Sequence, residues 1–322
     1  MVVKREITPK HEIVFTSAKS PADDNSPSLD DCPLLLNRLN IQSQVSSEKL
    51  SEIYREVKEA MKTLPVDPPT LKRLAPSGHG MDLRLRAVTI IRCLHLFFGG
   101  TSDVFATSLN VLDSFMSLVR VQQKYLSCVA AACFFISSKL HLEEEEIPSG
   151  SELAYLHGNK WTSSDLCRME VVILQKLKWD IPKTNYLTFI RLFEKLFAQF
   201  HHTSLCLDSL IHMAESFTKL EESTVFRAPT LAFCILCHIL EKQGNIAAET
   251  RLILIHLQLI CDIQDSELFE CKDLLGQSLK ENGLQVSQSR RPSVFFPFLK
   301  IRSRPSSEGE SELPSITEIS SY

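Results

Sequence analysis

The residue string with the clearest chemical meaning is Cys234-x-x-Cys237-His238, which has the spacing of a haem-attachment site. It lies in the middle of RAPTLAFCILCHIL, a segment that is apolar along most of its length. Such a segment is typical of a helix enclosed by its neighbours, and the chain does not open with the apolar region of an export signal. We therefore interpret both cysteines as thiols packed in a core, and expect no haem and no other cofactor or metal.

Glu170, in LCRMEVVILQKLKWDIP, is the second residue of chemical interest. At about 100° per residue of helix it falls on the apolar side, near Leu166, Ile173 and Leu177. A carboxylate on such a face needs a partner. Periodicity leaves two interpretations open, an edge position that reaches water or a nearby Lys or Arg, and a functional role.

Composition excludes several classes of function. The sequence contains no catalytic triad, metal-ligand spacing or phosphate loop in a plausible context, so we expect no enzyme. A net charge of −4 gives no overall basic field, and the longest apolar run, Leu231 to Cys237, is far shorter than the roughly 18 residues of a membrane span. Neither nucleic acid nor a membrane is expected as a partner. Cysteines scattered through apolar segments favour a reducing compartment, the nucleus and cytoplasm.

The elements that position these residues begin after an N-terminal extension, residues 1–79. Its first 43 residues are rich in Ser, Pro and Asp, and we expect them to be disordered. Apolar residues then recur at three- and four-residue steps, which predicts a helix over about 46–63. Prolines at positions 65, 68 and 69 end it.

Residues 80–182 read as five helices. The first two carry one apolar stripe each, formed by Leu83, Ala87, Ile90, Leu94 and Phe97, and by Phe105, Leu109, Leu112, Met116 and Val119. The third, YLSCVAAACFFISSK, is apolar or small nearly all round and is the expected hub. A short helix over 151–156 follows, and a fifth opens at Thr162 with Asp165 three residues on, as in a capping box.

Residues 183–284 repeat this organisation. Their first helix carries Leu187, Ile190, Phe193, Phe197 and Phe200 on one face. RAPTLAFCILCHIL is a second hub, and Pro229 stands at its favoured entry position. No strand pair appears, so the fold class is all-α, two consecutive bundles followed by a disordered acidic and Ser-rich tail, residues 285–322.

The first bundle resembles the cyclin box. In that family a Lys closes the third helix and an Arg-Met-Glu opens the fifth, and here Lys139 is followed by the acidic run 143–146, Pro148 and then Arg168-Met169-Glu170. SKLHLEEEEIP, SSDLCRME and, in the second half, LAFCILCHILE and DSELFECKDLL are similar to the cyclin G/I group. The resemblance covers about residues 80–285 and implies a tandem cyclin fold of two five-helix bundles.

The resemblance also implies a function and its residues. Cyclins use the hub Lys and this Glu to hold the regulatory helix of a cyclin-dependent kinase, so Lys139 and Glu170 are the expected kinase-binding residues. The chain would then be a regulatory subunit that controls cell-cycle progression. Lys139 has a purely structural explanation as well, because a cation is stabilised at any helix C-terminus.

One departure concerns the substrate-docking patch on the first helix, where many cyclins carry a Met-Arg-x-Ile-Leu-x-x-Trp type motif. We align it with a degenerate patch of Leu85, Arg86, Val88, Thr89 and Arg92. The arginine at position 86 matches the motif, whereas the polar residues at positions 89 and 92 replace apolar ones, including the Trp. The usual docking of substrates is therefore not expected.

The tail carries a second binding motif. Leu313, Ile316 and Glu318 fit L-x-x-I-x-E, by which disordered segments dock to B-prime regulatory subunits of protein phosphatase 2A. Two apolar side chains can fill two pockets while the carboxylate pairs with a basic residue. The alternative function is thus an adaptor that recruits this phosphatase without activating a kinase. A third use of the fold, on nucleic acid, would require a basic face.

Overall fold

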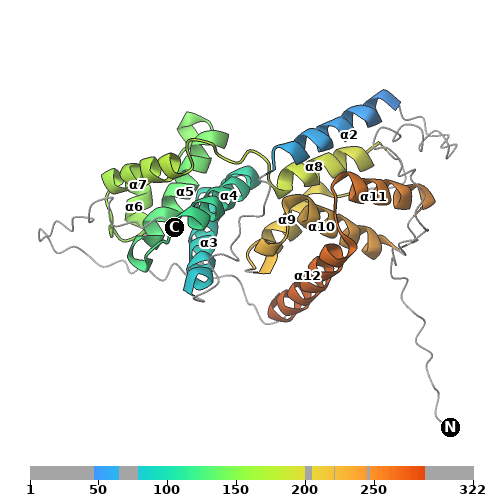
Figure 1. Cartoon of the computed structure of the whole chain (residues 1–322). Coiled ribbons are helices and arrows are strands. Elements are labelled where there is room, and N and C mark those ends of the chain that lie inside the picture. Colours follow the sequence, from blue (N-terminus) through green and yellow to red (C-terminus); the bar gives the residue numbers. More distant parts are fainter. Residues whose placement is uncertain (1–46, 65–78, 200–204, 221, 245–246, 287–322) are drawn as a thin grey trace, which may run out of the picture.

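Helices account for all regular elements in the described part of the chain. The computed structural model describes residues 47–64, 79–199, 205–220, 222–244 and 247–286 (Figure 1). Within these ranges the chain forms α-helices joined by short loops and 3-10 turns. The predicted all-α fold class is confirmed. The disorder predicted for both ends of the chain concerns residues that lie, apart from the last two residues of the final helix, outside the described ranges.

The first bundle is built around one buried helix, as predicted. Its helices are α3 (His79–Phe98), α4 (Ser102–Leu118), α5 (Leu126–His141), α6 (Gly150–Leu156) and α7 (Ser163–Lys176). Helix α5 contacts α3, α4 and α7, and its small residues Ala130, Ala131 and Ala132 are fully buried. Small side chains allow three neighbouring helices to approach one axis closely, which is why this sequence occupies the centre.

Local signals fixed the helix starts in this bundle. The Thr162 hydroxyl accepts a hydrogen bond from the backbone N–H of Asp165, whose carboxylate accepts one from the backbone N–H of Thr162. This is the predicted capping box. Thr101, at the start of α4, accepts from the backbone N–H of Val104 in the same way.

The buried face of α3 differs in part from the predicted stripe. Ala87 and Leu94 are buried as expected, but Phe97 is 52% exposed, and the core also takes Val88 and Ile91. The reason is that apolar residues occupy both sides of this helix, so periodicity alone did not select the side that faces α5. Helix α4 gave no such ambiguity, and its whole predicted stripe is buried.

The second bundle repeats the plan. Its helices are α8 (Tyr186–Phe197), α9 (Leu207–Phe217), α10 (Ala228–Gln243), α11 (Ala248–Ile260) and α12 (Asp265–Val286). Helix α10 contacts α8, α9 and α12, and Pro229 stands in its first turn. It is the predicted second hub. Helix α12 ends two residues beyond the predicted boundary at 284.

Helix α2 (Ser47–Lys62), predicted over 46–63, covers the second bundle (Figure 1). Ile53 and Val57 on its apolar face are buried in the same cluster as the core of α8. Lys195 of α8 donates to both carboxylate oxygens of Glu56, at 2.8 and 2.9 Å. The first helix that the structure describes thus packs on the second bundle.

Polar contacts join the two bundles directly. Arg191 of α8 forms a two-point ion pair with Asp103 of α4, with N–O distances of 2.7 and 2.6 Å. The side-chain amide of Asn110, also on α4, donates to the carbonyl of Thr184 in the connecting segment at 3.2 Å. Helix α4 is therefore the element of the first bundle that positions the second.

Candidate functional site

Lys139 stands in the last turn of the hub helix α5. The backbone N–H of Leu142 closes this turn by donating to the carbonyl of Ser138 at 2.9 Å. The Lys139 ammonium lies 4.3 Å from the ring centroid of Phe135, one turn earlier on the same helix. The helix dipole and the ring face both favour a cation here, so the ammonium is held at the surface end of α5.

Glu170 lies on α7 and forms an ion pair with Lys139, through Oε1 and Nζ. The Glu170 side chain is 13% exposed and that of Lys139 is 39% exposed. This pairing explains how a carboxylate is tolerated on the apolar side of α7. It also joins the two residues that the sequence singled out separately, 31 positions apart in the chain.

The pair keeps unused hydrogen-bonding capacity. Glu170 Oε2 makes no hydrogen bond to any residue that the structure describes, and Lys139 Nζ donates only to Glu170 within the same part of the chain. An ammonium carries three N–H donors and a carboxylate about four acceptor sites. The pair can therefore contact a partner's backbone through both charges without breaking its own bond.

Exposed apolar side chains stand near both residues in the sequence. Leu140, next to Lys139, is 52% exposed, and Val171, next to Glu170, is 43% exposed. Trp179 follows the end of α7 and is 67% exposed. Apolar side chains around a partly desolvated charged pair are the composition of a protein-binding surface.

Comparisons with known proteins agree on one family. Residues 52–182 match the model described as cyclin, N-terminal domain. Over these residues the chain is therefore similar to cyclins. It is 31% identical to cyclin-G2 of Mus musculus over 206 residues, which cover 62% of this chain and 58% of that protein. It is 35% identical to cyclin-G1 of Bos taurus over 130 residues, which cover 38% of this chain and 44% of that protein.

The solved structures show the same fold. An X-ray structure of a viral cyclin from herpesvirus saimiri matches this chain with a TM-score of 0.50 and 19% identity, over 62% of this chain and 86% of that chain. The tandem cyclin fold predicted from the sequence is confirmed. The matched region spans about half the length of the curated relatives. The similarity to cyclins supports a cyclin-like regulatory role.

The structure separates the five residues of the degenerate docking patch. Leu85 is 43% exposed, Arg86 and Thr89 are exposed, and Arg92 is half-buried. Val88 is 1% exposed and belongs to the core of the first bundle. The Thr89 hydroxyl donates to the carbonyl of Leu85 at 2.8 Å, so it is used within the helix. This face of α3 is mixed in character rather than apolar.

Sequence reasoning missed the buried arginine of α3, which is Arg84. It is 2% exposed and pairs through two hydrogen bonds with Asp113 of α4. A signal was present, because opposite charges stand at core positions of two consecutive apolar helices. Shifting the motif alignment by two residues would place Arg84, rather than Arg86, at the position of its arginine.

The haem-attachment string lies inside the second core. Cys234 and Cys237 are fully buried in α10, and Cys234 lies near Cys271 of α12. Burial raises the pKa of the Cys237 thiol well above its usual range, so this thiol stays protonated. Among the described residues no cluster of His, Cys, Asp and Glu has the geometry of a metal site.

Two further predictions concern the tail and membranes. The phosphatase motif of Leu313, Ile316 and Glu318 lies outside the described residues. As for membranes, none of the helices that the structure describes combines the length and the apolar character needed to span one.

Proposed function

We propose that this chain binds a cyclin-dependent-type protein kinase through the surface around Lys139 and Glu170. The similarity to cyclins and the cyclin fold favour a kinase partner. The observation that carries the proposal is the ion pair itself, which both residues enter while keeping free donors and acceptors. A partner segment that crosses this pair could donate a backbone N–H to Glu170 and present a carbonyl to Lys139.

The apolar neighbours supply the rest of the proposed surface. Leu140, Val171 and Trp179 are large, exposed and close in sequence to the pair or to the end of its helix. Burial of such side chains contributes most of the free energy of typical interfaces, whereas a central charged pair fixes the orientation of the partner. The partner helix should therefore be amphipathic, with one apolar face directed at these residues.

The test is a pull-down of cyclin-dependent kinases with the full chain and with the Lys139→Ala, Glu170→Ala double variant. We expect the double variant to lose the kinase. A matched control is Lys62→Ala, Glu59→Ala, which removes an exposed ion pair of 2.7 Å on the outer face of α2. The proposal fails if the Lys139 and Glu170 variant retains full binding while its fold, checked by circular dichroism, is intact.

A second candidate function is recruitment of protein phosphatase 2A through the tail. The observation that favours it is the fit of Leu313, Ile316 and Glu318 to L-x-x-I-x-E, within a stretch that also holds Glu308 and Glu310. The mixed character of the α3 face also suits a cyclin that does not dock the usual kinase substrates. Both functions are compatible, because they use separate parts of the chain.

This second function predicts that Leu313→Ala, Ile316→Ala abolishes co-purification of B-prime subunits. A control in the same tail is Leu299→Ala, Ile301→Ala, which removes the same residue types outside the motif. Equal loss in both variants, or no loss in either, would make the motif incidental.

We further propose that the protein acts in the nucleus and cytoplasm in control of the cell cycle, which fractionation of tagged protein can check.

A further inference from the structure

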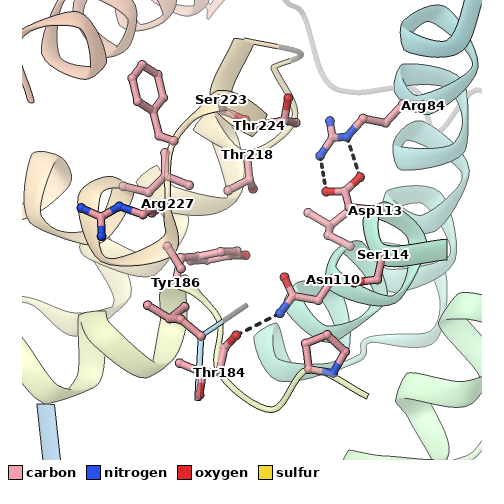
Figure 2. Close-up of a pocket in the computed structure, with 16 residues that line it drawn as sticks. Arg84, Asn110, Asp113, Ser114, Thr184, Tyr186, Thr218, Ser223, Thr224 and Arg227 are labelled. Carbon is pink, nitrogen blue, oxygen red and sulfur yellow. Dashed lines mark hydrogen bonds and ion pairs between the residues drawn. The ribbon is translucent and has the colours of Figure 1, made fainter. Parts of the chain in front are cut away.

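The junction between the two bundles contains a partly enclosed cavity of about 110 Å³ (Figure 2). Arg84 of α3 and Asp113 of α4 form one wall, and Tyr186 of α8, Thr218 and Ser223 form the other. Its volume is small compared with the several hundred Å³ of typical small-molecule sites. It has room for a few waters or for one small polar group.

Arg84 brings an unpaired donor to this cavity. Its Nε and Nη2 donate to the two carboxylate oxygens of Asp113, at 2.7 and 2.9 Å. Its Nη1 is buried and has no hydrogen-bond partner in the described part of the chain. The residue is only 2% exposed, so bulk water does not compensate for the missing bond. A buried donor without a partner is costly, which makes an acceptor in the cavity favourable.

Tyr186 brings a second donor from the opposite wall. The residue is 5% exposed, and burial raises the pKa of its hydroxyl, so the proton is retained at physiological pH. Its Oη is buried without a hydrogen bond to any described residue, and the Thr218 hydroxyl is its polar neighbour. In Figure 2 the hydroxyl of Tyr186 and the guanidinium of Arg84 lie on opposite sides of the same space.

Two further hydroxyl groups on that wall already use their protons in hydrogen bonds to backbone carbonyls. Ser223 Oγ donates to the carbonyl of Leu220 at 2.7 Å, and Thr218 Oγ1 donates to the carbonyl of Glu215 at 3.4 Å. Each oxygen keeps lone pairs, so it offers an acceptor where it lines the cavity. The cavity therefore presents two unpaired donors together with two acceptors.

This pattern matches a carboxamide. We propose that the cavity binds the side-chain amide of an Asn or Gln in a peptide segment, with its carbonyl oxygen accepting from Arg84 and its NH₂ group donating toward the opposite wall, where Ser223, Thr218 and Tyr186 lie. An anion fits less well. Asp113 already neutralises Arg84, and neither a carboxylate nor a phosphate offers an N–H donor to the two hydroxyl oxygens. The site is independent of the kinase and phosphatase surfaces proposed above.

Nuclear magnetic resonance titration of the full chain with acetamide tests the chemistry. We expect saturable shifts of the Arg84 Nε–H and Tyr186 ring signals in the millimolar range, and weaker effects of acetate and phosphate. Tyr186→Phe and Ser223→Ala should each weaken acetamide binding several-fold. Tyr155→Phe, which changes a tyrosine that is 68% exposed, is the control and should have no effect. Thermal melts show whether each variant is folded.

A second series separates the source of the amide. Alanine pentapeptides with a central Gln, Glu or Ala are titrated in the same way. Tighter binding of the Gln peptide than of acetamide supports a peptide segment as the ligand, and equal affinity supports a small free amide. Preference for acetate, phosphate or the Glu peptide would overturn the proposal. So would shifts that stay linear for every probe, since these would indicate a cavity filled by water alone.

Discussion

Asp113 follows Arg84 by 29 residues and accepts two hydrogen bonds from its guanidinium, at 2.7 Å from Nε and 2.9 Å from Nη2. The two side chains are 3% and 13% exposed, so the pair joins α3 to α4 at a site almost closed to water. Parallel hydrogen bonds between a guanidinium and a carboxylate are among the strongest polar contacts in proteins. Loss of one partner would leave the other charge buried and uncompensated.

We expect Asp113→Ala to lower the free energy of unfolding by about 3–5 kcal/mol, the cost of breaking a buried ion pair by removing one partner. Urea unfolding at neutral pH measures it. The double variant Arg84→Met, Asp113→Leu should recover much of the loss, because it removes both charges and restores apolar packing. Glu52→Ala is the control, since Glu52 pairs with Arg55 on an exposed face of α2 and its loss should cost under about 1 kcal/mol. Equal losses in Asp113→Ala and Glu52→Ala would contradict this prediction.

The ion pair of Lys139 and Glu170, unlike that of Arg84 and Asp113, should contribute little to the free energy of unfolding. Lys139 is more than one-third exposed, so solvent screens the attraction, and we expect a coupling free energy below about 1 kcal/mol in a double-mutant cycle. Chemical denaturation of the two single variants and the double variant gives this value. A coupling of several kcal/mol would indicate a structural role and would weaken the case for kinase binding. Weak coupling together with loss of the kinase would separate binding from stability.

Some of this fold could be read from the sequence because local signals determine it. The hub helices are apolar all round, and the helix starts at Thr101 and Thr162 carry side-chain caps. The face of α3 could not be read, since apolar residues line both of its sides. The element on which α2 packs could not be predicted either, because an amphipathic face shows that a helix is covered but does not identify the covering element.

The candidate site also has features that the sequence predicted and features that depend on tertiary contacts. The positions of Lys139 and Glu170 followed from a family resemblance, but their direct contact is a tertiary feature that no local pattern encodes. Arg84 was missed because a charged residue in an apolar helix is read as surface until its partner is known. Its partner, Asp113, stands on the next helix, and pairing such charges across helices needs the crossing geometry.

The turn after α7 offers a prediction about backbone strain. Lys178 and Trp179 have φ angles of 54° and 60°, a left-handed conformation that costs L-residues roughly 1–2 kcal/mol each. Lys178 is exposed, and its backbone N–H donates to the carbonyl of Gln175 at 3.0 Å. We expect Lys178→Gly to raise the free energy of unfolding by about 0.5–1 kcal/mol, after the entropy that glycine loses on folding. Thermal unfolding measures it, with Lys183→Gly, at an exposed position without such a φ angle, as a control that should not be stabilised.

The contact between the two bundles should depend on pH through Asp103. The hydrogen bond from Arg191 holds the pKa of Asp103 below its usual value of 3.8. A carboxylate whose pKa is lowered by folding contributes stability above its unfolded pKa, and this contribution is lost as the pH falls through the folded pKa. We therefore expect Asp103→Asn to lower the free energy of unfolding at pH 7 by about 1 kcal/mol, a modest value because the Arg191 side chain is 47% exposed.

The difference between wild type and Asp103→Asn should stay constant from pH 7 to about pH 5 and shrink once the pH drops below 3.8. Urea unfolding across this range follows it. Arg191→Ala should remove the pH dependence that Asp103 contributes, because the group that lowers the pKa is gone. A difference that grows toward acid would mean that Asp103 is destabilised by burial rather than held by Arg191, and the two bundles would then depend on Asn110 and apolar contacts for their junction.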